Sequence, residues 1–304
     1  MEIFRTSEDR FDDLADFAHA PSYVEVADPD DPDGVPLRMA YVEAGPGDGP
    51  VALLLHGEPT WSYLYRHLIR VLAEAGVRAV AVDLVGFGRS DKPLAIGDHS
   101  FARHVEWVRE AVFDHLDLRE VTLVGQDWGG LIGLRLVAEH PDRFSRVVAA
   151  NTGLPTGDHD MPEVWWSFRR AVESAAVLDI GRLVESGCVR ALAPADRAAY
   201  DAPFPDEASK AGPRAMPLLV PTRPDDPATE ANRDAWSVLA RWQKPFLTAF
   251  SDSDPITGAM APVIRKLVPG CAGLPHPVLA DAGHFLQEDA GAELGRVVAE
   301  FVRG

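Results

Sequence analysis

Hydrophobic residues along this chain follow two alternating patterns. Short continuous apolar runs are separated by longer segments in which apolar residues recur every three or four positions, as they do on one face of a helix. Continuous runs are typical of strands in a parallel sheet that helices cover on both faces. The predicted strands are Val51–Leu55, Arg78–Val82, Val121–Val124, Arg146–Ala150, Pro245–Phe250 and Pro277–Ala280.

Residues 154–231 interrupt this alternation. They contain no comparable apolar run, and three segments have helical spacing between turns that contain proline or glycine. The strand and helix pattern resumes beyond them, which favours an insertion over two tandem domains. We therefore expect a main α/β domain of residues 1–153 and 232–304, with a helical cap of residues 154–231. The predicted cap helices are Trp165–Ala176, Ile180–Val189 and Pro194–Tyr200.

Asp127 is the most informative candidate for chemistry. It is the central residue of Gly125–Gly129, between a predicted strand and a segment with helical spacing. A sharp strand-to-helix turn with small neighbours pushes its central side chain into a cleft, and in many enzymes that side chain is a nucleophilic serine. The sequence therefore predicts a carboxylate nucleophile at this position.

A carboxylate nucleophile suits attack on saturated carbon. A serine that displaced a leaving group from such a carbon would form an ether, which offers no carbonyl for water to attack. A carboxylate forms an ester, and water can then add to the carboxyl carbon of Asp127 and release the product. Alkyl halides and epoxides are therefore the candidate substrates.

A base and an acid are expected later in the chain, in the order nucleophile, acid, base. His284 follows the last predicted strand, and a neutral imidazole, with an ordinary pKa of about 6.5, can take a proton from water. Asp252 and Asp254 both follow the strand before it. Asp254 is preferred because it stands beyond the turn of residues 251–253. A second possible acid position, at the end of the fourth predicted strand, is occupied by Asn151, which carries no charge.

Four segments of the chain resemble haloalkane dehalogenases, and the match extends over nearly the whole sequence. The combination of Asn151 and Asp254 resembles the subfamily in which the catalytic acid follows the later strand. The resemblance implies an α/β-hydrolase fold with a mostly parallel central sheet, helices on both faces and an inserted helical cap. The segments are residues 56–66 (HGEPTWSYLYR), 125–130 (GQDWGG), 198–206 (AAYDAPFPD) and 281–288 (DAGHFLQE).

The resemblance also implies a reaction, namely hydrolysis of a carbon–halogen bond to an alcohol, a halide ion and a proton, with no cofactor and no metal. Negative charge builds on the halogen as its bond breaks, so a fixed neutral hydrogen-bond donor lowers the barrier. The indole N–H of Trp128, next to the nucleophile, is suited to this role. By resemblance, the backbone N–H groups of Glu58 and Trp128 form the oxyanion hole, and Glu58 helps to hold the hydrolytic water.

The second halide donor departs from the family pattern. Alignment on residues 178–181 puts Phe168 where this subfamily usually has a tryptophan and Trp165 where it usually has a phenylalanine. Positions three apart share one face of a helix, so the indole of Trp165 can reach the same cavity from one turn earlier. We expect Trp165 to be the second halide donor, with Trp166 as the alternative.

Epoxide hydrolases are the alternative function, because they share the aspartate elbow and often the following tryptophan. That family protonates an alkoxide with two cap tyrosines, whereas Tyr200 is the only tyrosine of this predicted cap, and Glu58 replaces an aromatic residue usual in their oxyanion loop. Fluoroacetate dehalogenases usually carry arginine where this chain has Trp128. A non-catalytic receptor on this fold often lacks a triad member, and none is missing here.

Composition narrows the expected partners. A net charge of −18 at pH 7 disfavours nucleic acid. Cys188 and Cys271 fall in different predicted domains without metal-ligand spacing, so no disulfide framework is expected. The first residues lack an apolar signal core, and no stretch approaches membrane-spanning length. We expect a cytoplasmic monomer or dimer whose partners are a small apolar halogenated substrate and a halide ion, with no membrane.

Overall fold

The computed structural model describes all 304 residues and is built around one large sheet. The strands are β1 (Ile3–Phe4), β2 (Ser22–Val26), β3 (Leu37–Ala44), β4 (Val51–Leu55), β5 (Arg78–Val82), β6 (Lys92–Pro93), β7 (Val121–Gln126), β8 (Phe144–Ala150), β9 (Phe246–Thr248), β10 (Phe250–Ser251) and β11 (Val278–Leu279). Seven of them form a sheet of order β2-β3-β5-β4-β7-β8-β9. β2, β3 and β5 pair antiparallel, and the other neighbours pair parallel.

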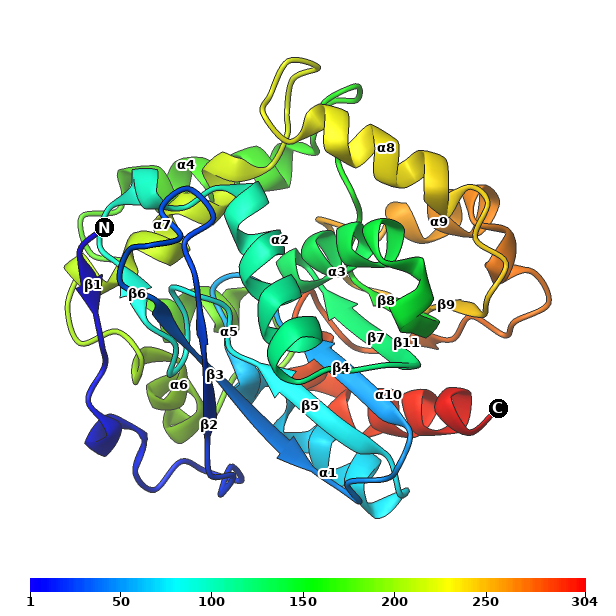
Figure 1. Ribbon diagram of the computed structural model, residues 1–304, viewed down its shortest axis with the longest axis horizontal. Coiled ribbons are helices and arrows are strands. Elements are labelled where there is room, and N and C mark those ends of the chain that lie inside the picture. Colours follow the sequence, from blue (N-terminus) through cyan, green and yellow to red (C-terminus); the bar gives the residue numbers. More distant parts are fainter.

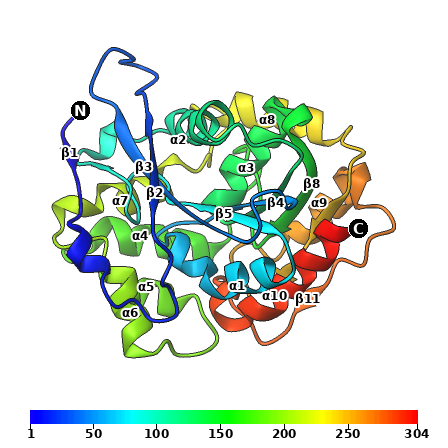
Figure 2. The same cartoon turned by 60° about the horizontal axis from the view of Figure 1, so that its bottom comes forward.

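Helices cover both faces of this sheet. The α-helices of the chain are α1 (Arg66–Glu74), α2 (Phe101–Arg109), α3 (Trp128–Glu139), α4 (Glu163–Ser174), α5 (Ile180–Ser186), α6 (Pro194–Asp201), α7 (Ala211–Leu219), α8 (Thr229–Leu239), α9 (Met260–Leu267) and α10 (Leu286–Arg303), of which α4 to α7 lie in the segment between β8 and β9. α1 packs against α10, and α3 packs against α2 and α8. Figure 2 shows α1 and α10 below the strands, with α2, α3 and α8 above them. The expected α/β fold is therefore confirmed.

None of these helices has both the length and the apolar composition needed to cross a bilayer.

The parallel strands agree well with the predictions, and the differences lie at the ends of the sheet. β4 and β5 have the predicted bounds. The predicted strand Pro245–Phe250 is instead divided, because β9 ends at Thr248 and β10 pairs with β11 in a separate two-stranded sheet. β2 and β3 were not predicted. β2 lies at the edge of the sheet and buries only its last residue, Val26, so it lacks the continuous apolar run that marks the central strands.

Between β8 and β9 the structure contains helices and no strand. α4, α5 and α6 correspond to the three predicted cap helices, and Figure 1 shows α4 to α7 gathered on the left of the molecule. α7 was not predicted, because prolines at positions 213 and 217 read as helix breaks. The division into a main domain and a cap stays a prediction, and its boundary at residues 231 and 232 falls inside α8, which packs on α3.

α4, α5 and α6 share one hydrophobic core with the sheet. Trp165 of α4, Ile180 of α5 and Tyr200 of α6 belong to the same continuous cluster of buried side chains as Leu53 of β4. The helices between β8 and β9 are therefore held against the sheet over a broad apolar contact, and the cavity described below lies where the two layers meet.

Candidate active site

Asp127 occupies a strained turn between β7 and α3. Its backbone has φ 49° and ψ −124°, a conformation that residues other than glycine rarely adopt. The turn is also crowded: a Cβ atom added to Gly129 would stand 1.9 Å from the carbonyl oxygen of Leu55, and one added to Gly57 would stand 2.4 Å from the Cβ of Asp127. The glycines therefore allow the backbone to approach closely while the aspartate side chain is directed into the cavity.

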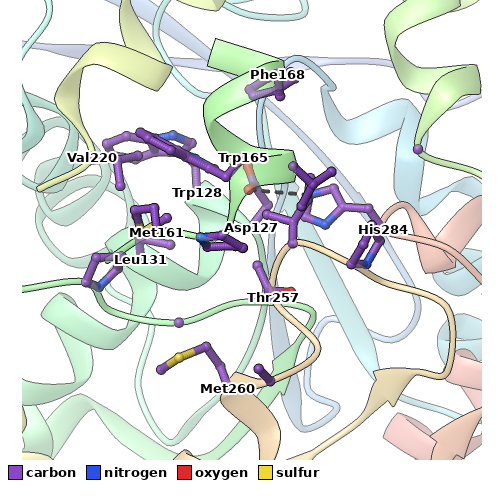
Figure 3. A pocket seen from close by; sticks show the side chains of 18 of the residues that line it. Asp127, Trp128, Leu131, Met161, Trp165, Phe168, Val220, Thr257, Met260 and His284 are labelled. Carbon is purple, nitrogen blue, oxygen red and sulfur yellow. Dashed lines mark ion pairs between the residues drawn. The ribbon is translucent and has the colours of Figure 1, made fainter. Parts of the chain in front are cut away.

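The structure brings Asp127, His284 and Asp254 together. His284 lies in the turn between β11 and α10, with its Nε2 3.4 Å from Oδ2 of Asp127. On the other side of the ring, Nδ1 lies 3.1 Å from Oδ2 of Asp254. Figure 3 shows the carboxylate of Asp127 facing His284 across the dashed line. The three groups thus form a chain in which the imidazole stands between two carboxylates.

Hydrogen bonds within its own turn hold the side chain of Asp254 in place. Its side chain is fully buried, Oδ1 accepts the backbone N–H of Ile256 at 2.9 Å, and Oδ2 accepts the backbone N–H of Thr257 at 3.2 Å and also its hydroxyl. Burial raises the pKa of Asp254, but the charge of His284 and these hydrogen bonds outweigh it and hold the pKa below its ordinary value. Asp252 is exposed and accepts the backbone N–H of Asp281 instead, so Asp254 is the acid that contacts the imidazole.

His284 is buried between these carboxylates. Burial lowers its pKa, but the charges and hydrogen bonds of Asp254 and Asp127 outweigh that effect and raise the pKa to about 10. Nδ1 donates to Asp254, because a carboxylate can only accept. The protonation of Nε2 depends on the charge that Asp127 carries.

Asn151, which follows β8, ties the neighbouring loops together. Its Nδ2 donates to the hydroxyl of Ser251 at 2.8 Å, to the carbonyl of Gly283 at 2.9 Å and to the carbonyl of His284 at 3.0 Å. It makes no hydrogen bond to the imidazole ring. Asn151 therefore holds the backbone that carries His284, while Asp254 contacts the ring.

Glu58 approaches Asp127 from the loop after β4. Its backbone N–H donates to Oδ1 of Asp127 at 2.9 Å. Its carboxyl group lines the cavity, and Oε1 is buried without a partner in the protein. Burial raises the pKa of Glu58 well above its ordinary value, and the charge of Asp127 adds to that shift, so the protonated, uncharged carboxyl group is favoured. The backbone N–H of Trp128, by contrast, makes no hydrogen bond to the carboxylate of Asp127, so its place in an oxyanion hole stays a prediction.

A cavity of about 800 Å³ opens above Asp127. Trp128 and Trp165 both line it and are 3% and 5% exposed, and neither indole N–H has an acceptor in the protein. In the view of Figure 3 they lie on the opposite side of Asp127 from His284. Phe168 lines the cavity as well. Trp166 does not line it and instead packs edge-on against Trp165, with 4.8 Å between the ring centroids. Trp165 is thus better placed than Trp166 to reach a ligand.

Two residues near His284 were not predicted. Gln126, the last residue of β7, places its amide nitrogen 3.2 Å from the carbonyl oxygen of His284. Asp289 of α10 accepts the backbone N–H of Gly283 at 2.9 Å. The position of Gln126 directly before the nucleophile was the only sequence signal for either residue, since both contacts depend on how distant loops meet.

Comparisons with known proteins show which family the chain resembles over nearly its whole length. Residues 50–291 match the family model for the alpha/beta hydrolase fold. Among curated proteins, the chain is similar to a haloalkane dehalogenase of Psychrobacter cryohalolentis, with 50% identity over 99% of this chain and 98% of the relative. It is also similar to a haloalkane dehalogenase of Mycobacterium marinum, with 52% identity over 97% of each chain.

Solved structures give the same picture. The haloalkane dehalogenase DpaA of Paraglaciecola agarilytica, described as tetrameric, matches with a TM-score of 0.88 and 36% identity over 98% of this chain and 97% of that one. The haloalkane dehalogenase DbeA of Bradyrhizobium elkani matches with a TM-score of 0.77 and 27% identity over 94% of this chain and 98% of that one.

Proposed function

The chain belongs to the haloalkane dehalogenase family, and on that premise we propose that it hydrolyses carbon–halogen bonds through a transient ester on Asp127. The observation that carries this proposal is the carboxylate of Asp127 at a strained turn, with the Nε2 atom of His284 3.4 Å away and an apolar cavity above it. A carboxylate in this place can displace a halide and then be released by water.

In the first step, a carboxylate oxygen of Asp127 attacks the carbon that bears the halogen. A carbon–oxygen bond forms as the carbon–halogen bond breaks, and the bonding pair leaves with the halide ion. The indole N–H groups of Trp128 and Trp165, which have no acceptor in the protein, donate to the departing halide. The buried surroundings strengthen these hydrogen bonds because little water competes for the halide.

In the second step, water adds to the ester. Formation of the ester removes the charge of Asp127, one of the two carboxylates that raise the pKa of His284, so that pKa falls. Nε2 of His284 can then take a proton from the water that attacks the carboxyl carbon, while Asp254 stabilises the resulting imidazolium. The Glu58 backbone N–H stabilises the oxygen that becomes negative, and collapse releases the alcohol and a proton.

The lining of the cavity disfavours the alternative functions. No tyrosine lines it, and the hydroxyl of Tyr200 donates instead to Glu288 outside the cavity. The two proton donors that epoxide opening requires are therefore missing. No lysine or arginine lines the cavity either, so it lacks the side chains best suited to hold a substrate carboxylate such as that of fluoroacetate. The site suits a neutral, apolar halogenated substrate.

The experiment that tests this proposal combines a substrate panel with a trapping variant. Short bromo-, chloro- and iodoalkanes and one epoxide are scored for proton and halide release, and we expect release from at least one haloalkane and no turnover of the epoxide. His284→Phe removes the base, so one displacement should occur and the ester should persist. Mass spectrometry should then find one alkyl group on the peptide that contains Asp127. An unmodified chain after a burst of halide would contradict the two-step scheme.

We propose that the protein acts in the cytoplasm as a monomer or dimer. DpaA, a relative described as tetrameric, makes the assembly state worth measuring directly. Light scattering on an eluting size-exclusion peak should give the mass of one or two 33.0 kDa chains, and a mass near four chains would contradict this expectation.

A further inference from the structure

The side chain of Gln126 contacts His284, the proposed catalytic base, without lining the cavity. Gln126 is the last residue of β7 and is fully buried. Its side-chain nitrogen lies 3.2 Å from the carbonyl oxygen of His284 and 3.3 Å from the Nε2 atom of the same residue. One amide group therefore spans the backbone and the ring of His284.

The hydrogen-bonding chemistry of the amide fixes its orientation. The carbonyl oxygen of His284 can only accept, so the NH₂ end of Gln126 must face it, and that same nitrogen then faces Nε2. The reverse orientation would set the amide oxygen against the carbonyl oxygen. In the observed orientation, Oε1 of Gln126 is buried without a partner in the protein. The NH₂ group thus makes both contacts, while the amide oxygen is left without a hydrogen bond.

We propose that Gln126 is a positioning residue that keeps Nε2 of His284 unprotonated when the ester is ready for hydrolysis. An amide N–H can donate only to a nitrogen that carries a lone pair, so it stabilises the neutral ring and opposes a proton on Nε2. Nδ1 donates to Asp254 at 3.1 Å, which leaves Nε2 as the accepting nitrogen. This role depends on the proposed function, in which Nε2 takes a proton from water.

The contact matters most after the first chemical step. In the free protein, Oδ2 of Asp127 lies 3.4 Å from Nε2 and favours a proton there. Esterification removes that charge, and the hydrogen-bonding partners of the ring are then Asp254 at Nδ1 and Gln126 at Nε2, with the buried carboxyl group of Glu58 as the other titratable group that interacts with the ring. Asp254 still favours the imidazolium, and Gln126 is the group that favours the neutral base. The N–H group of Gln126 therefore offsets part of the increase in the His284 pKa that Asp254 causes. It does so at the hydrolysis step, where His284 has to act as a base.

The test is an NMR titration of the His284 ring nitrogens in protein that carries Asp127→Asn. The side-chain amide is uncharged, as the ester is, so this variant represents the second stage without needing turnover. We expect the neutral ring to carry its proton on Nδ1. Adding Gln126→Met should raise the pKa of His284 by about one unit, a tenfold change in proton affinity that corresponds to about 1.4 kcal/mol.

Gln287→Met in the same background is the matched control. Gln287 is an equally buried glutamine three residues after His284, and it makes no hydrogen bond to the ring. We expect this substitution to leave the pKa of His284 unchanged. A proton on Nε2 of the neutral ring, no shift with Gln126→Met, or an equal shift with Gln287→Met would each overturn the proposal. If Gln126→Met does not fold, the tautomer of the His284 ring in the Asp127→Asn variant alone still tests the proposal.

A kinetic measurement on the active enzyme adds a second readout. Gln126→Met should move the acidic limb of the pH profile for ester hydrolysis upward by about one unit, as the His284 pKa rises. A lower rate with an unmoved profile would indicate a merely structural role and would overturn the proposal. Failure of the proposed function would look different, because no ester would form in His284→Phe, whereas the NMR result would be unaffected.

Discussion

At the scale of single residues, the proposed halide site consists of two indoles that come from different helices. Trp128 follows the nucleophile in α3, and Trp165 comes from α4. Both line the cavity, and neither indole N–H is used by another group in the protein. A hydrogen bond to a charged partner contributes about 1.5–3 kcal/mol, so loss of one donor should weaken halide binding by roughly tenfold or more.

Trp165→Phe should therefore raise the bromide concentration needed for half-maximal quenching of tryptophan fluorescence. Trp166→Phe is the matched control, because it removes a neighbouring indole that does not line the cavity. We expect the control to bind bromide as the unmodified protein does. Equal titration curves for the two variants would assign the second halide donor to another group.

Some residues of the candidate site could be predicted from the sequence, and others could not. Asp127 and His284 follow strands in motifs that predict a turn, so their positions could be predicted from the sequence, while their roles stay predictions. The choice between Asp252 and Asp254 depended on which carboxylate points inward, and only the structure places Asp254 against the ring. Gln126 could not be assigned a role, because its contact with His284 spans 158 positions of the chain and follows from loop packing.

At the scale of elements, α10 connects the segment after α5 to the loop that carries His284. Oδ2 of Asp289 accepts the backbone N–H groups of Gly283 and Val189, both at 2.9 Å, and Oδ1 accepts that of Arg190 at 2.9 Å. Val189 and Arg190 follow α5, so one carboxylate holds the segment after this helix and the residue before His284 in a fixed relation.

Asp289→Asn replaces one accepting oxygen by a donor and leaves buried N–H groups facing it. We expect the free energy of unfolding to fall by about 1–3 kcal/mol, measured by urea denaturation, and ester hydrolysis to slow more than halide release. Asp281→Asn is the control, because Asp281 is exposed and its carboxylate accepts no hydrogen bond. Matching stability and rates in the two variants would rule out this coupling.

Elements were predictable where one physical signal dominates. The central parallel strands are apolar on both faces and were found, whereas the edge strand β2 and the proline-containing helix α7 were not. β10 pairs with β11 outside the main sheet. No periodicity in the sequence predicts that the strand divides here and pairs with a different neighbour. Local patterns thus give the layers, and long-range pairing decides how their ends are arranged.

At the scale of the whole molecule, buried histidines make stability depend on pH. His99 and His104 stack with Nδ1 of the first 3.1 Å from Nε2 of the second, and burial lowers both pKa values, that of His99 to about 4. Burial also lowers the pKa of His19, His56 and His67. The folded state therefore keeps these rings neutral where the unfolded chain, with ordinary values of about 6.5, takes up protons.

The sign follows from that proton uptake. Stability is fully present above pH 6.5 and is lost as the pH falls toward 4, by about 2 kcal/mol between pH 7 and 5 for His99 alone. His284 does not add to this loss, because its pKa is raised and its contribution is complete below pH 6.5. Glu58 acts in the opposite sense, since its raised pKa favours the folded state as the pH falls. Urea denaturation at pH 7 and pH 5 should show a net loss at pH 5, and equal or greater stability there would contradict this account.

The most direct test of the central claim follows the oxygen that water supplies. One catalytic cycle is run in ¹⁸O-labelled water with protein in excess over a bromoalkane. If water attacks the carboxyl carbon of an ester on Asp127, the alcohol leaves with an unlabelled oxygen and the peptide containing Asp127 gains the label. Label in the alcohol and none in the protein would mean that water attacks the substrate directly, which would contradict the account.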